Sequence, residues 1–355
     1  MSEQGIRIGE RTVGLGQSTY VVAEMSGNHN GDIGRAVEII HAAAAAGADA
    51  VKLQTYTPDT LTIDVARPEF IVPGGGPWGG RSLYDLYREA HTPYEWHPRL
   101  FEAARAAGVQ VFSTPFDATA VDLLEDLGAV AYKVASFEMV DDHLLRRVAC
   151  TAKPVIVSTG MATLEEISHA VGVLQDAGAR EILVLKCTSA YPAPDDAMRL
   201  ASLPVLAAAT GCPVGLSDHS LGTTAAVVAV TLGACLIEKH LTLRRGDGGV
   251  DSAFSLEPEE FRNLVREVRR AEAIIGSPGF GRGVAEEGSL VFRRSLYVIA
   301  DVLEGEVFGP TNVKAIRPGH GLAPRHLEFV IGRRATHDAP RGTALTWDLV
   351  GPPAK

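Results

Sequence analysis

The feature that most constrains the fold is a regular alternation of apolar and helix-like segments over residues 20–275. Eight short apolar runs, each typical of a buried strand, alternate with eight segments of helical pattern, at intervals near those of a βα unit. Eight such units are the expectation for a (β/α)₈ TIM barrel. An open, doubly wound sheet is the alternative, but it usually has fewer strands, and no Gly-x-Gly-x-x-Gly pattern follows the first run.

The composition and the pattern of the sequence change after residue 275. Residues 276–290 are rich in glycine, which indicates a linker. Residues 291–355 contain short β runs and several Gly and Pro breaks, with no long helix before the end. We therefore predict a barrel domain over residues 1–275, a linker, and a small, mostly β domain whose most unusual feature is Arg317 on a Pro-Gly turn.

One connection inside the predicted barrel is much longer than the others. Residues 56–93 separate the second strand from the next helix and include the run PGGGPWGGRS. We predict a long loop here, and loops of this length are usually functional or disordered.

Composition limits the classes of function. The formal net charge of −10 argues against a nucleic-acid partner, although local Lys and Arg could still bind an anionic substrate. The four cysteines show no CxxC spacing, which favours reduced thiols. The first residues lack the apolar stretch of a signal peptide, and the longest apolar run is too short to cross a bilayer. We expect a soluble, cytoplasmic protein with no membrane partner.

Polar residues follow almost every predicted strand. Chemistry in parallel α/β proteins is placed at the carboxyl ends of the strands. A closed barrel would gather at one mouth Glu24, Lys52, Gln54, Thr114, Lys133, Ser136, Glu138, Ser158, Lys186, Ser189, Ser217, His219, Glu238 and His240.

Two histidines follow neighbouring predicted strands in this set. His219 lies in the sequence SDH after one strand, and His240 lies in EKH after the next. Adjacent parallel strands would bring the two rings together, and imidazole is a common ligand of divalent metals. We interpret them as a metal pair. The alternative is two unrelated histidines at the surface or in the core.

Three lysines in the same mouth indicate an anionic ligand. Lys52, Lys133 and Lys186 end otherwise apolar strands, and small hydroxyl side chains lie near them. Lysine neutralises phosphate and carboxylate charge, and Ser and Thr donate hydrogen bonds to their oxygens. Any one lysine could instead be a solvated surface charge. A Schiff-base aldolase would also use a barrel lysine, but it does not explain the paired histidines.

Motifs along nearly the whole chain carry a resemblance to a known family. They include AEMSGNHNGD, VKLQTYTPDTLT, SLYDLYREAHTPYEWH, FSTPFD, YKVASFE, VSTGMATLEE, KCTSAYPAP, GLSDHSLG, EKHLTL and GGVDSAFSLEP. In this order they resemble the sialic acid synthase family, and residues 291–350 resemble its antifreeze-like (SAF) domain. The resemblance implies a TIM barrel followed by a β-clip domain, in a domain-swapped homodimer. It also implies condensation of phosphoenolpyruvate with an open-chain acylated amino sugar and water, giving a nonulosonic acid and phosphate.

The resemblance also implies roles for individual residues. His219 and His240 would bind Mn²⁺ or Mg²⁺, and Glu24 would act beside the reacting carbon, although it could instead only orient a strand end. Arg317 would reach over the active site of the partner subunit. Phosphoenolpyruvate would be surrounded by Lys52, Thr114, Lys133, Ser136, Ser158, Ser189 and Ser217. The sugar would face Gln54, Glu138, Tyr191 and Asp251.

Two departures bear on the identity of the sugar. The sequence ASFE at residues 135–138 replaces the GSGE usual in N-acetylneuraminate synthases, and Ser189 stands where those enzymes commonly have Asn. Both move the expected sugar away from N-acetylmannosamine. The resemblance as a whole implies 2,4-diacetamido-2,4,6-trideoxy-altrose instead. N-acetylneuraminate and legionaminate synthases, which share the chemistry, are the alternatives. A non-catalytic sugar- or ice-binding protein is a more distant one.

Overall fold

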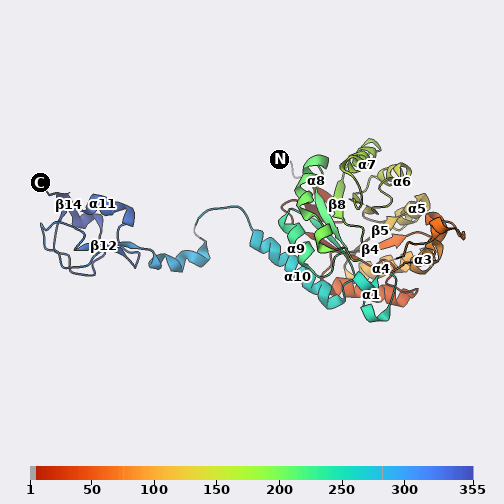
Figure 1. Ribbon diagram of the computed structural model, residues 1–355, viewed down its shortest axis with the longest axis horizontal. Helices are drawn as coiled ribbons and strands as arrows, with labels where there is room; N and C mark the ends of the chain where they lie inside the picture. Colours follow the sequence, from red (N-terminus) through yellow and green to blue (C-terminus); the bar gives the residue numbers. More distant parts are fainter. Residues whose placement is uncertain (1–4, 75, 282, 355) are drawn as a thin grey trace. The chain divides into compact units, whose positions relative to one another are not determined.

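The computed structural model describes residues 5–74, 76–281 and 283–354 of the chain. The chain divides into two compact units, Met1–Gly276 and Ser277–Lys355, drawn in Figure 1 and considered separately below. Among the described residues, no helix combines the length and the apolar character needed to cross a membrane.

The larger unit is built on a closed barrel of eight parallel strands. Strand β10 lies between β3 and β9, so the sheet has no free edge, and the expected TIM barrel is confirmed. Closure rules out the doubly wound alternative, which needs an open sheet. The strands are β3 (Tyr20–Glu24), β4 (Ala50–Thr55), β5 (Gln110–Pro115), β6 (Tyr132–Val134), β7 (Val155–Ser158), β8 (Ile182–Cys187), β9 (Val214–Asp218) and β10 (Leu236–His240).

A ring of helices surrounds the barrel (Figure 1). Several begin at an acidic residue whose side chain accepts from free backbone N–H groups, as Asp32, Asp117 and Asp141 do. Their buried faces pack against the outer faces of the strands in one continuous apolar cluster. The helices are α1 (Ile33–Ala46), α4 (His97–Ala107), α5 (Ala118–Asp126), α6 (Asp142–Ala149), α7 (Leu164–Asp176), α8 (Leu203–Thr210), α9 (Thr224–Thr231) and α10 (Pro258–Ile275).

A hairpin that the sequence analysis does not predict precedes the barrel. Strands β1 (Gly5–Ile8) and β2 (Arg11–Gly14) pair antiparallel. Ile6, Ile8 and Val13 join the apolar cluster inside the barrel, together with residues such as Tyr20 at the start of a strand. The hairpin therefore packs at the amino-terminal ends of the strands and leaves the other mouth free.

The connection at residues 56–93 is more ordered than the predicted loop. It contains helices α2 (Pro58–Leu61) and α3 (Leu83–Ala90). Ser82 caps α3 by accepting from the N–H of Asp85 at 3.0 Å, and Leu86 is buried. Prediction from helical periodicity failed because each helix is short and its stability comes from packing on the barrel.

The smaller unit has an apolar core of its own, formed by residues such as Leu296, Phe308 and Leu345. Strands β11 (Ser295–Val298) and β12 (Val313–Ile316) pair antiparallel, as do β13 (Arg333–Ala335) and β14 (Val350–Pro353). The short helix α11 (Leu327–Val330) lies between the two pairs in sequence. Part of the segment expected to be a linker forms a 3₁₀ helix, η7 (Val284–Phe292).

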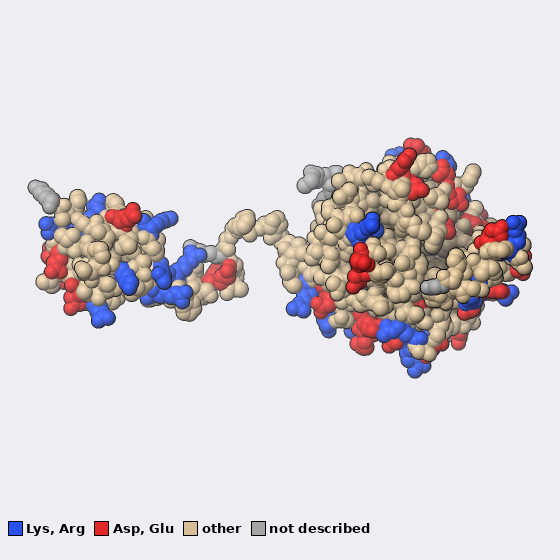
Figure 2. All heavy atoms as spheres, viewed as in Figure 1, with Lys and Arg blue, Asp and Glu red and all other residues tan. Residues whose placement is uncertain are grey.

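Surface charges follow the composition. On the side of the larger unit seen in Figure 2, acidic and basic side chains are interspersed, with no extended basic area. This distribution accords with the formal net charge of −10.

Candidate active site

A cavity of about 490 Å³ opens at the carboxyl ends of the barrel strands. Its lining brings together residues that are far apart in sequence, as expected where parallel strands end at one mouth. Two further predicted residues, Thr114 and Ser189, lie beside the lining side chains. The predicted residues that line the cavity are Glu24, Lys52, Gln54, Lys133, Ser136, Glu138, Ser158, Tyr191, Ser217, His219, Glu238, His240 and Asp251.

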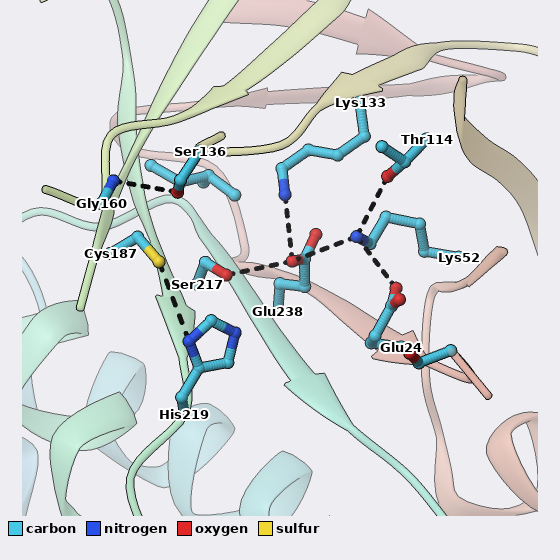
Figure 3. A network of polar contacts seen from close by, with 12 residues as sticks. Glu24, Lys52, Thr114, Lys133, Ser136, Gly160, Cys187, Ser217, His219 and Glu238 are labelled. Atoms are coloured by element: carbon cyan, nitrogen blue, oxygen red, sulfur yellow. Dashed lines mark hydrogen bonds and ion pairs between the residues drawn. The ribbon is translucent and has the colours of Figure 1, made fainter. Parts of the chain in front are cut away.

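Glu238 is the centre of a buried charge network on the cavity floor (Figure 3). Its Oε1 lies 3.1 Å from Lys133 Nζ and 3.4 Å from Lys52 Nζ, and it accepts from Ser217 Oγ at 3.1 Å. Burial alone would raise the pKa of Glu238, but Lys133 and Lys52 lower it to about 2. The position of Glu238 after an apolar run predicts that it lies at the mouth but indicates no role for it. In the structure it is the carboxylate that holds the two lysines in place.

Glu24 is the second carboxylate of this network. It forms an ion pair with Lys52 at 2.9 Å and accepts from Gln54 Nε2 at 2.8 Å. Lys52 also donates to Thr114 Oγ1 at 3.3 Å. Burial outweighs the effect of Lys52 and raises the pKa of Glu24 to about 7. Glu24 is therefore able to gain or lose a proton near neutral pH, whereas Glu238 stays ionised.

The two predicted histidines lie side by side. The ring centroids of His219 and His240 are 5.4 Å apart. Thr188 O lies 3.1 Å from His219 Nδ1, which leaves Nε2 of that ring available. His240 Nδ1 is buried, and no described residue offers it a hydrogen-bond partner. Burial, His219 and Lys52 lower the pKa of His240 well below its ordinary value, so its ring is neutral.

This pair fits a divalent metal whose remaining positions are open. Neutral imidazole is the ligating form, and catalytic metal sites keep positions for water or substrate. Within the described ranges, no group of three or more His, Cys, Asp and Glu side chains is arranged to hold a metal. A metal held here would thus depend on His219 and His240, with other ligands coming from solvent or substrate.

A second buried ion pair fixes the strand ends that carry the histidines. Lys239 Nζ lies 2.8 Å from Asp218 Oδ2, and both side chains are 0% exposed. Asp218 Oδ1 accepts from the N–H and the hydroxyl of Ser220, and Lys239 also donates to Ser220 O. The pair therefore joins β9 to β10 and closes the turn that contains His219.

Close backbone approach brings three hydroxyl-bearing strand ends together. The N–H of Gly160 donates to Ser136 Oγ at 2.9 Å. A Cβ at Gly160 would lie 2.1 Å from Ser189 Oγ and 2.8 Å from Ser136 Oγ. Glycine is therefore required at this position, because any side chain would separate Ser136 from Ser189.

Further polar residues line the cavity around Gln54 and Glu138. Gln54 Nε2 donates to Ser26 Oγ at 3.0 Å, and Ser26 is hydrogen-bonded to Asp251. Glu138 has a buried oxygen, Oε2, without a hydrogen-bond partner among the described residues, and burial raises its pKa to about 7. Tyr191 stacks at a tilt on His219, with ring centroids 4.4 Å apart.

The structure changes the list of site residues in two respects. Lys186, which the sequence analysis groups with the other lysines, donates to Cys187 O at 2.8 Å and does not line the cavity. Ser26 and Cys187 were missed: Ser26 lies in the polar segment after β3, and Cys187 Sγ is 3.8 Å from His219 Nδ1. Arg317 belongs to the smaller unit and is treated below.

The fold and this cavity define a class: a TIM-barrel enzyme for a small anionic substrate. Its active site holds two buried lysines that pair with two of the carboxylates, beside a histidine pair. The NeuB family model matches residues 39–279, and the SAF domain model matches residues 293–351. The chain belongs to the NeuB family, whose synthases condense phosphoenolpyruvate with sugars.

Three similar proteins have related activities in their names. The pseudaminic acid synthase of Campylobacter jejuni is 43% identical over 93% of this chain and 96% of its own length. The N,N'-diacetyllegionaminic acid synthase of Legionella pneumophila is 33% identical over 95% and 96%. The crystal structure of N-acetylneuraminic acid synthetase from Leptospira borgpetersenii aligns with a TM-score of 0.73 at 29% identity, covering 81% of this chain and 95% of that one.

Proposed function

We propose that this chain is a pseudaminic acid synthase that condenses phosphoenolpyruvate with 2,4-diacetamido-2,4,6-trideoxy-altrose. The observation that carries the proposal is the similarity over nearly the whole length to a pseudaminic acid synthase, at 43% identity. The identity to the legionaminic acid synthase is lower, at 33% over a similar share of the chain. We place the reaction in the cytoplasm, which the four free cysteines support.

Phosphoenolpyruvate is proposed to bind on the cavity floor. Lys52 and Lys133 supply positive charge to its phosphate and carboxylate, because both are buried and converge on one point, Glu238. Hydroxyl donors complete the pocket, and buried donors of this kind bind anions more strongly than solvated ones. They are Thr114, Ser136, Ser158, Ser189 and Ser217.

The sugar is proposed to enter above the floor with its aldehyde at the histidine pair. His219 and His240 would hold Mn²⁺ or Mg²⁺, and such a metal supplies Lewis-acid polarisation of a carbonyl oxygen when bound. The hydroxyl and acetamido groups of the sugar would bind to Gln54, Glu138, Tyr191 and Asp251. The unpartnered Glu138 Oε2 supports this assignment, since a buried carboxylate oxygen is costly without a donor.

The reaction forms one carbon–carbon bond and breaks one carbon–oxygen bond. The methylene carbon of phosphoenolpyruvate attacks the aldehyde carbon, and the aldehyde oxygen takes up a proton to become a hydroxyl. Water then adds at C2, and cleavage of the bond between C2 and the phosphate oxygen releases phosphate. The new C2 hydroxyl loses its proton as the 2-keto group forms, and this proton balances the one taken up by the aldehyde oxygen. Glu24 is proposed to accept the proton of that water and pass it to the leaving phosphate, a role for which a pKa of about 7 suits it.

Phosphate release with matched sugars tests the proposal. Phosphoenolpyruvate would be supplied with 2,4-diacetamido-2,4,6-trideoxy-altrose, with the corresponding legionaminate precursor or with N-acetylmannosamine, in the presence of Mn²⁺. We expect the highest kcat/KM with the altrose, and a product whose mass matches the nonulosonic acid. A higher value with either other sugar would assign the chain to that synthase, and no release with any of them would favour a binding protein.

Lys133→Ala is predicted to weaken the handling of phosphoenolpyruvate. Truncating one member of a buried charged contact should cost about 2–5 kcal/mol of binding. Steady-state kinetics should show a large rise in the KM for phosphoenolpyruvate and a smaller change in the KM for the sugar. Lys186→Ala is the matched control, since this lysine is at the same mouth but outside the cavity. A large rise in the KM for the sugar with a smaller change for phosphoenolpyruvate would show that Lys133 binds the sugar instead.

The smaller unit is proposed to complete the active site of a second copy in a domain-swapped homodimer. Arg317 is exposed, and no ion pair formed within the described residues includes it. The turn after it is fixed by Ser295, whose hydroxyl donates to Pro318 O at 2.7 Å and accepts from the N–H of Gly321 at 2.9 Å. A guanidinium held on such a turn suits an acylated, polar sugar.

Complementation between two inactive variants tests the exchange. His240→Ala and Arg317→Ala should each be inactive alone, whereas subunit exchange should restore activity. In a mixed dimer, one site combines the barrel of the Arg317→Ala chain with the smaller unit of the His240→Ala chain. When equal amounts of the two variants exchange subunits at random, about half of the dimers are mixed. Each mixed dimer has one intact site, so about a quarter of all sites should be active. Arg341→Ala is the control and should keep full activity. Proven heterodimers without activity would mean that the exchange does not occur.

A further inference from the structure

The cavity has one side that the proposed chemistry leaves without a role. Val72, Trp78, Leu83 and Leu86, here called the apolar wall, line the cavity from the segment that follows β4. Leu86 is buried and the other three are half-buried. Of the described cavity-lining residues between 58 and 90, only Trp78 and Tyr87 have polar side-chain atoms. The wall therefore offers few hydrogen-bonding groups to a ligand.

The apolar wall is held by one hydrogen bond to the residues after β10 and by hydrogen bonds within its own segment. Trp78 Nε1 donates to Val250 O at 2.6 Å, so the one polar group of the Trp78 side chain already has a partner. The N–H of Val72 donates to Arg81 O at 2.8 Å, and the N–H of Gly80 donates back to Val72 O at 2.9 Å. The last two bonds join Val72 to Gly80 and Arg81. The wall is thus a preformed surface, so substrate binding does not lose free energy in ordering it.

Aromatic contacts show how far the wall lies from the reacting centre. The Trp78 ring is 5.2 Å from the Tyr191 ring, and Tyr191 is 4.4 Å from the His219 ring. The centroids of Trp78 and His219 are therefore less than about 10 Å apart. A six-carbon chain extends roughly 6 Å, judged from the rise of an extended polypeptide. A sugar with its aldehyde near the histidines would therefore cover more than half of this distance and place its other end towards Trp78.

We propose that the apolar wall selects sugars whose C6 carries a methyl group in place of a hydroxyl group. The inference rests on the proposed function and adds a determinant of specificity to it. A methyl group at C6 would pack against Val72, Leu83 and Leu86 and remove their apolar surface from water. A hydroxyl at C6 would lose its water without gaining a partner from the apolar wall, because the indole N–H of Trp78 is already engaged.

Two sugars that differ only at C6 provide the test. They are 2,4-diacetamido-2,4,6-trideoxy-altrose and the same sugar with a hydroxyl at C6, each assayed with phosphoenolpyruvate and Mn²⁺. For the unmodified chain we expect kcat/KM to be about 10–100-fold higher for the 6-deoxy sugar, the usual range for an apolar pocket that discriminates one small group. Leu83→Asn and Val72→Thr add polar atoms to the wall and should each reduce this ratio several-fold.

Matched controls come from equivalent positions outside the cavity. Leu83 is the first residue of α3 after a serine cap, and Leu164 is the first residue of α7 after a threonine cap, exposed at 48%. Leu164→Asn and Val140→Thr should leave the ratio unchanged. Equal kcat/KM for the two sugars, or a ratio that survives both wall variants, would overturn the inference while the synthase activity stands. Failure to turn over either sugar would instead overturn the proposed function.

Discussion

Replacing His240 by alanine should lower kcat at least about 10³-fold, because several kcal/mol of Lewis-acid stabilisation would be lost with the metal. His219→Ala should have the same effect, since the two rings lie 5.4 Å apart. The barrel should still fold, because His240 is the last residue of β10 and its ring lines a cavity. Calorimetry should show weaker Mn²⁺ binding by both variants. This result would attribute their loss of activity to loss of the metal.

An exposed histidine provides the control for this experiment. His169 pairs with Asp142 on the outside of the barrel, with a side chain that is 61% exposed. His169→Ala should bind Mn²⁺ and turn over substrate normally. Near-normal turnover by His240→Ala in chelator-treated buffer would show that the histidines are not a metal pair.

Replacing Lys239 by methionine should lower the free energy of unfolding by about 3–5 kcal/mol, because it would leave the carboxylate of Asp218 buried without its partner. Burial lowers the pKa of Lys239, and Asp218 opposes that change, so the charge of the lysine depends on this carboxylate. Urea unfolding followed by the loss of helical circular dichroism would measure the difference.

Two further variants show whether the loss comes from the unpaired charge. Lys153→Met removes a partly exposed lysine that pairs with Glu125 at 2.6 Å, and it should cost less than about 1 kcal/mol. Adding Asp218→Asn to Lys239→Met removes the buried charge, so part of the lost stability should return. If Lys239→Met were as mild as Lys153→Met, the buried pair would contribute little to holding β9 and β10 together.

The sequence predicted the barrel and most of its mouth because both depend on local patterns. Buried parallel strands are short apolar runs, and the polar residues directly after them must lie at one end once the sheet closes. His219 and His240 could be placed near each other on that basis alone. The pairing partners could not be predicted, since Lys133 meets Glu238 across the inside of the barrel and no local pattern records that contact.

The incorrect or missing predictions concern features set by tertiary packing. Lys186 lies in an apolar strand as Lys133 does, but the side chain of Lys186 donates to the carbonyl of Cys187 and does not line the cavity. Helix α3 and the hairpin of β1 and β2 are short, and their stability comes from apolar contacts with the barrel. Ser26 gave no signal beyond its place in a polar loop.

The closure of β10 onto β3 has a consequence for how the enzyme is made. The register places His240 opposite Glu24, so the first and last strands of the ring each supply part of the active site. During synthesis at about 5–20 residues per second, the strand that ends in Glu24 waits roughly 10–40 s for the strand that ends in His240. Until then the nascent chain has the strands that carry both lysines but no complete active site, so a prematurely terminated chain cannot consume phosphoenolpyruvate.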